Sequence, residues 1–345
     1  MNSRELFLNA ISLKKTERAP FWIMRQAGRY LPEYRALKEK HPFTQIVKTP
    51  GLALEATLQP IRRFDFDCAI LFSDILVVSE AMGFPYSFAD GKGISLSRTI
   101  SSASDIENMP SPDGVCERLF YVKNALGLIR AELPNKALLG FCASPFTLAA
   151  YMVEGGSSNA FPKYRAFIKN CPKEFEKLMD ILAQATSSYA KMQANCGADA
   201  VQIFDSHAYL APRGMYENLS GRYARKVAGS LKGEAYSILF ANKMSGRFGE
   251  IISAGADAYS LDSSARLSEI RKKFGGGFAL QGNLAPEILS AESPQACAQK
   301  TREILGDMAG SRGHILNLGH GILPDANLEN VEAFAETAKN FKYDE

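Results

Sequence analysis

The sequence lacks the features that mark membrane, secreted and metal-binding proteins. No hydrophobic run in its 345 residues is long enough to span a membrane or to serve as a signal peptide. The six cysteines are scattered and form no Cys-x-x-Cys pair, and the four histidines fall in no zinc-binding pattern. The net charge of only +3 does not indicate a nucleic-acid surface. We therefore expect a soluble, cytoplasmic protein without a metal and without nucleic-acid or membrane partners.

What the chain does contain is a repeated unit: a short apolar run, a polar or glycine-containing turn, and a longer stretch of helical character. Most runs are continuous rather than alternating, which is typical of strands buried on both faces of a parallel sheet. Amphipathic segments separate them, for example 173–196, 293–309 and the shorter 73–82. The eight apolar runs are Phe21–Met24, Cys68–Phe72, Ala137–Cys142, Ala200–Phe204, Tyr236–Ala241, Ala258–Leu261, Phe278–Gln281 and His314–Leu318.

This alternation predicts an α/β fold, namely a single (β/α)8 TIM barrel that takes up residues 1–345 as one domain. A doubly wound sheet is the alternative, but no Gly-x-Gly-x-x-Gly nucleotide turn occurs in the chain. The connection from Gly83 to Pro134, which includes Gly91-Lys92-Gly93, predicts an elaborated loop after the second strand.

Polar side chains follow almost every predicted strand. In barrels of this kind, catalytic groups lie where strands end and the next loops begin. The sequence therefore predicts a site at one mouth of the barrel. The residues in question are Arg25, Asp74, Ser144, Asp205, Ser206, Asn242, Lys243, Asp262, Asn283 and His320.

Arg25 and Arg29 flank Gln26-Ala27-Gly28 in the first of these loops. Two guanidinium groups at a strand end suit bidentate recognition of carboxylates or phosphates. The spacing fits equally well two arginines on one face of a helix that form surface ion pairs. Such pairs contribute little to stability.

The other candidates also have structural interpretations. Asp74 fits a helix cap as well as a ligand-binding carboxylate, and Tyr151 fits a core tyrosine. Ser206 fits a turn serine, and His320, between two glycines, fits a buried structural histidine. Neighbours in sequence cannot assemble a catalytic triad, so none is expected from Asp205-Ser206-His207.

Six segments together resemble the uroporphyrinogen decarboxylase family. They keep the family's order and span residues 20 to about 325. The chain departs from the family at three places. Ala143-Ser-Pro-Phe146 stands where Gly-Ala-Pro-Trp is usual, His207 where tryptophan or a similar residue is usual, and Ser263 where tryptophan is usual. The segments are Pro20-Phe-Trp-Ile-Met-Arg-Gln-Ala-Gly-Arg-Tyr-Leu-Pro-Glu-Tyr34, Phe72-Ser-Asp-Ile-Leu-Val-Val78, Gly140-Phe-Cys-Ala-Ser-Pro-Phe-Thr-Leu-Ala-Ala-Tyr-Met-Val-Glu-Gly-Gly156, Phe204-Asp-Ser206, Leu280-Gln-Gly-Asn-Leu284 and Leu316-Asn-Leu-Gly-His-Gly321.

The resemblance implies a (β/α)8 barrel that forms homodimers and converts uroporphyrinogen to coproporphyrinogen in heme biosynthesis. Four acetate side chains lose CO2 and become methyl groups, and no cofactor takes part. The protonated pyrrole ring itself accepts the electrons, a task that other decarboxylases assign to a cofactor.

The resemblance also assigns roles to residues. Asp74 would accept hydrogen bonds from the pyrrole N–H groups and stabilise the cationic ring, and Arg25 and Arg29 would hold carboxylates, one of them also orienting or relaying a proton. Main-chain contacts would come from Gln26, Ala27 and Gly28, and hydrogen bonds from Tyr151, Ser206 and His320, with Tyr151 helping to position Asp74.

Two other classes remain open. Methyltransferases of the same superfamily hold zinc through His-x-Cys, whereas His320 is followed by Gly321 and Ile322. A non-catalytic tetrapyrrole carrier would need the arginines as well.

Overall fold

A parallel sheet of seven strands forms the centre of the computed structural model, which describes residues 1–89 and 93–343. The strands pair in the order β1-β4-β5-β6-β7-β8-β9, each parallel to the next. Seven of the eight predicted strands are thereby confirmed. They are β1 (Cys68–Ile70), β4 (Ala137–Ala143), β5 (Ala200–Asp205), β6 (Tyr236–Ala241), β7 (Ala258–Ser260), β8 (Ala279–Gln281) and β9 (His314–Ile315).

The predicted strand Phe21–Met24 is present only as a single parallel bridge between Phe21 and Leu316. Phe21 nevertheless contacts both ends of the sheet. The N–H of Leu316 donates to the Pro20 carbonyl at 2.9 Å, and the N–H of Asp67, just before β1, donates to the Phe21 carbonyl at 3.0 Å.

Side-chain amides replace the backbone ladder beyond this bridge, which explains why a regular strand is absent. The Met24 N–H donates to the side chain of Asn317 at 3.0 Å. The buried Gln26 side chain accepts from the Ile70 N–H at 3.2 Å and donates to the Cys68 carbonyl at 3.1 Å. The prediction of a strand is therefore wrong for the residues after Phe21.

A chain of buried polar groups shows that the sheet is curled. The indole N–H of Trp22 donates to Gln281 at 3.0 Å, and Gln281 donates in turn to Gln202, also at 3.0 Å. Gln281 lies on β8 and Gln202 on β5, and two strands separate them in the sheet. A direct contact between them requires the sheet to bend around a common interior.

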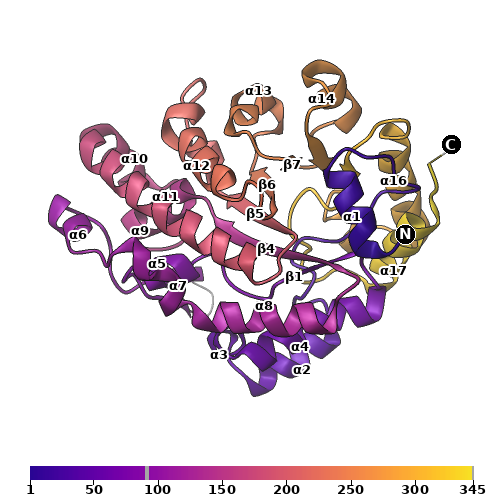
Figure 1. The fold of residues 1–345 in the computed structure, drawn as a ribbon, viewed down its shortest axis with the longest axis horizontal. Coiled ribbons are helices and arrows are strands. Elements are labelled where there is room, and N and C mark those ends of the chain that lie inside the picture. Colours follow the sequence, from indigo (N-terminus) through magenta and orange to yellow (C-terminus); the bar gives the residue numbers. More distant parts are fainter. Residues whose placement is uncertain (90–92, 344–345) are drawn as a thin grey trace.

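Helices surround the outside of this sheet, and the two termini lie on the same side of the molecule (Figure 1). The predicted helices 173–196 and 293–309 are confirmed as α11 and α16, whereas the segment 73–82 contains only the short α5. The helices are α1 (Ser3–Ile11), α2 (Pro32–Lys40), α3 (Phe43–Lys48), α4 (Pro50–Phe64), α5 (Val77–Ala81), α6 (Ala103–Glu107), α7 (Val115–Arg118), α8 (Phe120–Glu132), α9 (Pro145–Glu154), α10 (Pro162–Asn170), α11 (Pro172–Asn195), α12 (Arg222–Ser230), α13 (Phe248–Ile251), α14 (Leu267–Phe274), α15 (Ile288–Ala291), α16 (Pro294–Asp307) and α17 (Leu328–Asn340).

The connection from Gly83 to Pro134 contains an antiparallel hairpin, β2 (Tyr86–Ala89) and β3 (Gly93–Leu96), followed by α6, α7 and α8. Gly91 and Lys92 of this connection lie outside the described residues. The hairpin packs on the end of α9, where the Leu96 N–H donates to the Gly155 carbonyl at 3.0 Å. Gly156 has a φ of +148°, and a side chain there would collide with the Ile94 carbonyl.

Within the described ranges, no helix has the length and apolar character needed to cross a membrane. All six cysteines belong to these ranges, and each is unpaired.

Candidate active site

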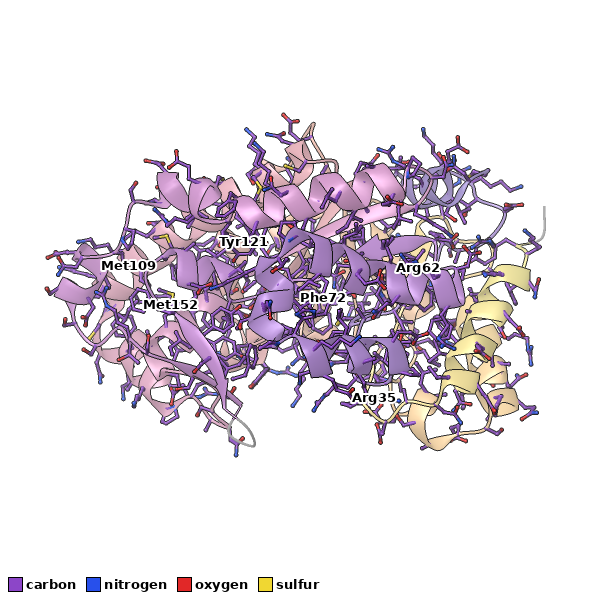
Figure 2. The ribbon with its side chains drawn as sticks, turned by 90° about the horizontal axis from the view of Figure 1, so that it is seen from below. Arg35, Arg62, Phe72, Met109, Tyr121 and Met152 are labelled. Carbon is purple, nitrogen blue, oxygen red and sulfur yellow. The ribbon has the colours of Figure 1, made fainter. Side chains whose placement is uncertain are left out.

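A cavity of about 990 Å³ opens at the carboxyl ends of the strands. All nine residues predicted for the site line it, namely Arg25, Gln26, Ala27, Gly28, Arg29, Asp74, Tyr151, Ser206 and His320. They come from the loops after the Phe21 bridge, β1, β5 and β9, and from helix α9. Seen from below in Figure 2, Phe72, which also lines the cavity, lies near the middle of the molecule between Arg62 and Met152.

Arg25 and Arg29 lie in an irregular segment between Phe21 and α2, so the interpretation as a helical pair is wrong. Both are exposed, and neither makes an ion pair within 4.0 Å to a described residue. Arg25 has a φ of +64°, a left-handed conformation that a non-glycine residue adopts only when its surroundings enforce it.

The last loop of the sheet enforces the position of Arg25. The Ile322 N–H donates to the Met24 carbonyl at 2.9 Å, next to the bond from Met24 to Asn317. The Arg25 side chain then passes directly over Gly321, where a Cβ atom would lie only 2.8 Å from its Cγ and Nε atoms. A glycine at 321 is therefore needed for the present course of the arginine.

Asp74 combines a local bond with an unusual environment. Its carboxylate accepts from the Leu76 N–H at 2.7 Å, but α5 begins only at Val77 and has no side-chain cap, so Asp74 closes a turn rather than capping a helix. Burial raises the pKa of Asp74 to about 6, although the hydrogen bond from the Leu76 N–H, the nearby Tyr86 hydroxyl and the charge of Arg25 act in the opposite direction. A carboxyl group that titrates near neutral pH suits proton chemistry.

Tyr151 and His320 complete the polar lining near Asp74. Burial and the nearby charge of Asp74 raise the pKa of Tyr151 to about 12, so its hydroxyl stays protonated. Burial and the charge of Arg25 lower the pKa of His320, whose ring packs edge-on against Phe240 at 5.8 Å. No hydrogen bond joins Tyr151 to Asp74 among the described residues, so the expected positioning contact is not observed.

Several other strand-end residues point away from the cavity. Asp205 is fully buried and accepts hydrogen bonds from the hydroxyls of Ser144, Thr147, Tyr216 and Ser220 at 2.6–3.2 Å. Asn242 donates to the Ser206 carbonyl, Lys243 lies over the Tyr209 ring, and Asn283 donates to the Asp262 carbonyl. The His207 ring packs between Tyr151 and Phe161, so no triad forms with Asp205 and Ser206.

The sequence reasoning missed residues of α2 and the hairpin that also line the cavity. Tyr34 and Lys38 come from α2, and Phe88 and Ile94 from the hairpin strands. The spacing of Tyr34 and Lys38, four residues apart, places both on one helix face directly after the Arg29 loop. This spacing could have predicted Tyr34 and Lys38 as site residues, whereas no sequence pattern indicates the hairpin residues Phe88 and Ile94.

No group of three or more His, Cys, Asp or Glu residues in the described ranges is arranged to hold a metal ion.

The fold and the site together define a class: a curled, parallel α/β protein with an enzyme-like cavity at the carboxyl ends of its strands. Its arginines suit a ligand with several acidic groups. Asp74, the one carboxylate that the described residues contribute to the lining, suits a ligand on which positive charge develops.

The comparisons with known proteins identify the family. The family model described as uroporphyrinogen decarboxylase (URO-D) matches residues 2–341. A uroporphyrinogen decarboxylase of Ruthia magnifica is 40% identical over 97% of this chain and 98% of its own, and one of Pseudomonas syringae pv. tomato is 42% identical over 95% and 94%. The chain belongs to the uroporphyrinogen decarboxylase family.

A solved structure shares the fold at much lower identity. A methyltransferase from Methanosarcina mazei superimposes with a TM-score of 0.83 at 20% identity and covers 98% of both chains.

Proposed function

We propose that this protein removes CO2 from the four acetate side chains of uroporphyrinogen III and so forms coproporphyrinogen III in heme biosynthesis, without a cofactor. One observation carries the proposal: two arginines without ion-pair partners among the described residues and a carboxyl group of raised pKa share one cavity. Membership of the family supports the same reaction.

The cavity suits a ligand that is polar at its edge and flat and apolar at its centre. Uroporphyrinogen carries eight carboxylates around a ring of four pyrroles. Arg25 and Arg29, joined by Lys38 of α2, hold carboxylates at the rim. Phe72, Phe88 and other aromatic residues of the lining face the ring system. The volume of about 990 Å³ is large for a small-molecule site.

The reaction needs a place for the electron pair that the departing CO2 leaves behind. Protonation of the ring carbon that carries the acetate makes the pyrrole a cation, which accepts this pair. A second protonation, at the methylene carbon, gives the methyl group, and loss of the first proton restores the ring. Each turnover therefore consumes one proton per carboxylate.

Asp74 is the residue that this chemistry needs most. Its carboxylate accepts the pyrrole N–H groups and stabilises the ring while it is cationic. A fixed charge aimed at a developing charge contributes roughly 10²–10³ in rate. Arg25 stands near enough to lower the pKa of Asp74 and thereby keeps a larger share of it ionised.

The remaining residues orient the substrate. Hydrogen bonds to the substrate come from Tyr151, Ser206 and His320. The Tyr151 hydroxyl is protonated and can donate. Among the first-loop residues the Gln26 carbonyl already accepts from the Tyr30 hydroxyl at 2.7 Å, so Ala27 and Gly28 offer the main-chain contacts. Arg25 or Arg29 orients an acetate or passes on a proton.

The test is direct. The purified protein is incubated anaerobically with uroporphyrinogen III and a chelator, without added cofactor, and the products are separated by their number of carboxylates. We expect heptacarboxylate to tetracarboxylate products in sequence. Their absence would overturn the proposal, and methyl transfer that depends on zinc would favour the methyltransferase class.

We further propose that the sheet closes as an eight-stranded (β/α)8 barrel, with the Phe21 segment in the eighth position, and that residues 1–345 form one domain. The hydrogen bonds of this segment to Leu316 and Asp67 support closure. The family resemblance supports a homodimer in the cytoplasm, which light scattering and cell fractionation would test.

A further inference from the structure

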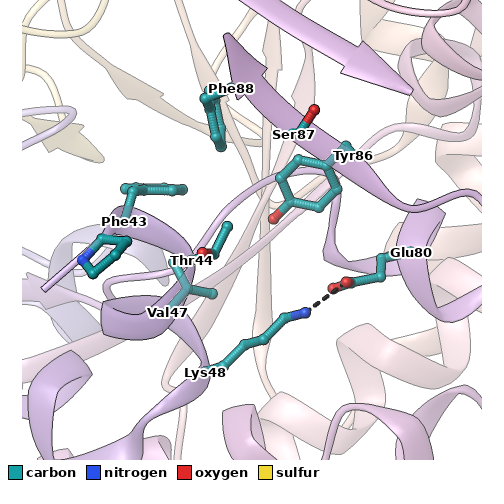
Figure 3. Close-up of a pocket in the computed structure, with 9 residues that line it drawn as sticks. Phe43, Thr44, Val47, Lys48, Glu80, Tyr86, Ser87 and Phe88 are labelled. Carbon is teal, nitrogen blue, oxygen red and sulfur yellow. Dashed lines mark hydrogen bonds and ion pairs between the residues drawn. The ribbon is translucent and has the colours of Figure 1, made fainter. Parts of the chain in front are cut away.

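Aromatic rings line the cavity in two places, and what lies behind them differs. On the hairpin side, the ring centres of Phe43 and Phe88 lie 4.9 Å apart. Both rings also line a second hollow of about 430 Å³ between α3 and strand β2 (Figure 3), so they have space on either side. On the α9 side, by contrast, Tyr151 is backed by buried rings.

Ring packing alone holds the Tyr151 side chain. Its hydroxyl makes no hydrogen bond to a described residue. Two rings pack against it: His207, at 4.9 Å between ring centres and tilted by 57°, and Phe161, edge-on at 6.2 Å. Because no polar contact with a described residue fixes the hydroxyl, the position of the ring decides where the hydroxyl lies, and His207 is the nearer of the two rings.

His207 is an unusual residue for such a place. It is only 9% exposed, and neither of its ring nitrogens has a hydrogen-bond partner among the described residues. Burial lowers its pKa to about 4, so the ring is neutral near pH 7. An aliphatic side chain of similar volume would fill the same space without leaving buried polar atoms unpaired. Packing density alone therefore does not account for a ring at this position.

Phe161 supports His207 from the other side. Its ring centre lies 4.4 Å from that of His207, and its backbone has a φ of +50°. A bulky residue adopts this left-handed conformation only where its surroundings enforce it. The Phe161 N–H donates to the Ser158 hydroxyl at 3.1 Å, which secures the turn. The three rings of Tyr151, His207 and Phe161 thus form one contact group that begins at the cavity.

The backbones that carry Tyr151 and His207 are joined through Thr147. The Thr147 hydroxyl accepts from the His207 N–H at 3.3 Å and donates to the buried Asp205 carboxylate at 3.2 Å. Tyr151 follows Thr147 by four residues, about one turn of α9. Helix α9 and the loop after β5 are therefore fixed relative to each other, and the ring contact sets the remaining freedom of the Tyr151 side chain.

We propose that His207 is a positioning residue, whose ring holds Tyr151 at the angle at which the Tyr151 hydroxyl reaches the substrate. The inference rests on the proposed function, in which this hydroxyl donates to the bound tetrapyrrole. His207 is not among the residues that line the cavity, so it acts only through Tyr151. A Tyr151 ring released from this contact makes the hydrogen bond for part of the time, which weakens substrate binding.

The experiment compares His207→Leu with His207→Phe. Both substitutions remove the unpartnered nitrogens, but only phenylalanine keeps a flat ring against Tyr151. We expect KM for uroporphyrinogen III to rise about fivefold in His207→Leu, with kcat within about twofold of wild type. In His207→Phe, KM should recover to within about twofold of wild type. Urea unfolding of each variant verifies that folded proteins are compared.

His314→Leu is the matched control. His314 is also buried, and burial lowers its pKa to about 4 as well. Its ring nitrogens, however, contact the Tyr343 hydroxyl at 2.9 Å and the Gly282 carbonyl at 3.2 Å, and it does not line the cavity or touch a residue of the contact group. The control should lose stability, because these partners are left unpaired, and keep KM within about twofold.

A double-mutant cycle tests whether His207 acts through Tyr151. Tyr151→Phe removes the hydroxyl, and in that background His207→Leu should raise KM no further. If His207→Leu does not fold, Phe161→Leu loosens the same contact group from its other side and takes its place, with KM expected to rise in the same direction.

The outcomes separate this inference from the function on which it rests. A wild-type protein that forms no product overturns the proposed function and the role of His207 with it. An active wild type overturns the role of His207 alone if KM is unchanged in the leucine variant, if His314→Leu raises KM equally, or if His207→Phe fails to restore it. Independent, multiplied increases in the double variant would overturn it as well.

Discussion

The two ends of the sheet carry charged residues in opposite arrangements. At the amino ends, an aspartate stands immediately before each of three strands: Asp67 before β1, Asp199 before β5 and Asp257 before β7. All three are engaged. Arg18 binds Asp67 with both terminal nitrogens, and the side chain of Asp257 accepts from Ser237.

Asp199 is the most connected of the three. It bonds Arg4 at 2.8 Å and Arg130 at 2.6 Å, and it accepts from the N–H of Leu138 on the neighbouring strand at 2.9 Å. At the carboxyl ends, by contrast, the arginines of the first loop have no ion-pair partner among the described residues, and Asp74 is held at a raised pKa. Charges at one end hold strands together, while those at the other end are kept ready for a ligand.

The largest effect on stability is expected from breaking the amino-end network. Asp199→Asn leaves Arg4 and Arg130 without their carboxylate. Removal of one partner of a buried ion pair costs about 3–5 kcal/mol, and because the two arginine side chains stay 40% and 18% exposed we expect about 3 kcal/mol. Because Asp199 lies at the other end from the cavity, kcat of the folded fraction should stay within about twofold of wild type.

Urea unfolding and steady-state kinetics on the same preparation measure both quantities. A kcat loss as large as that expected from cavity variants would remove the distinction between the two ends.

Two buried histidines should make stability fall in acid. Burial lowers the pKa of His207 and of His314 from the ordinary histidine value of about 6.5 to about 4 in each case. Between pH 6.5 and 4 the unfolded chain therefore binds more protons than the folded protein, and stability falls as pH falls. Each histidine should cost on the order of 2–3 kcal/mol across this range.

His207→Phe removes one of these contributions and should flatten the pH dependence of the urea midpoint below pH 6.5. An unchanged slope would mean that His207 is charged in the folded state.

A smaller effect should follow from moving Arg25 without removing it. In Gly321→Ala, the new Cβ would lie 2.8 Å from atoms of the arginine, so the guanidinium must shift. We expect kcat/KM to fall about tenfold, on the scale of a displaced charge-assisted contact. Gly306→Ala is the matched control, because nothing lies within 4 Å of a Cβ at that position. Equal behaviour of the two variants would show that the course of Arg25 does not matter.

The sequence could predict a strand wherever the backbone hydrogen-bond ladder is complete, and it failed where side chains replace that ladder. Continuous apolar runs located seven strands because such runs are buried on both faces of a parallel sheet. The Phe21–Met24 run has the same composition, yet the Asn317 and Gln26 amides displace its ladder after one bridge. The pattern of apolar residues does not reveal where side-chain amides replace the backbone hydrogen bonds of a strand.

The candidate site was predictable in part for a similar reason. Arg25, Asp74, Ser206 and His320 follow strands, so their position at one edge could be read from chain order. Asp205 also ends a strand, but its side chain is bound by Ser144, Tyr216 and Ser220 and does not line the cavity. The hairpin residues Phe88 and Ile94 could not be anticipated, since the hairpin is placed beside the cavity by tertiary packing, such as the bond from Leu96 to Gly155.

The central claim is that Asp74 serves the reaction at the expense of the fold, and Asp74→Asn tests it most directly. The raised pKa means that the folded protein binds a proton more readily than the unfolded chain between pH 3.8 and about 6, so ionised Asp74 destabilises the fold above pH 6. At pH 7.5 we predict that the variant unfolds with a free energy on the order of 1–2 kcal/mol higher than wild type, while binding uroporphyrinogen with similar affinity and losing roughly 10²–10³ in kcat. Lower stability, or equal losses of affinity and turnover, would contradict this and make Asp74 an ordinary turn or binding residue.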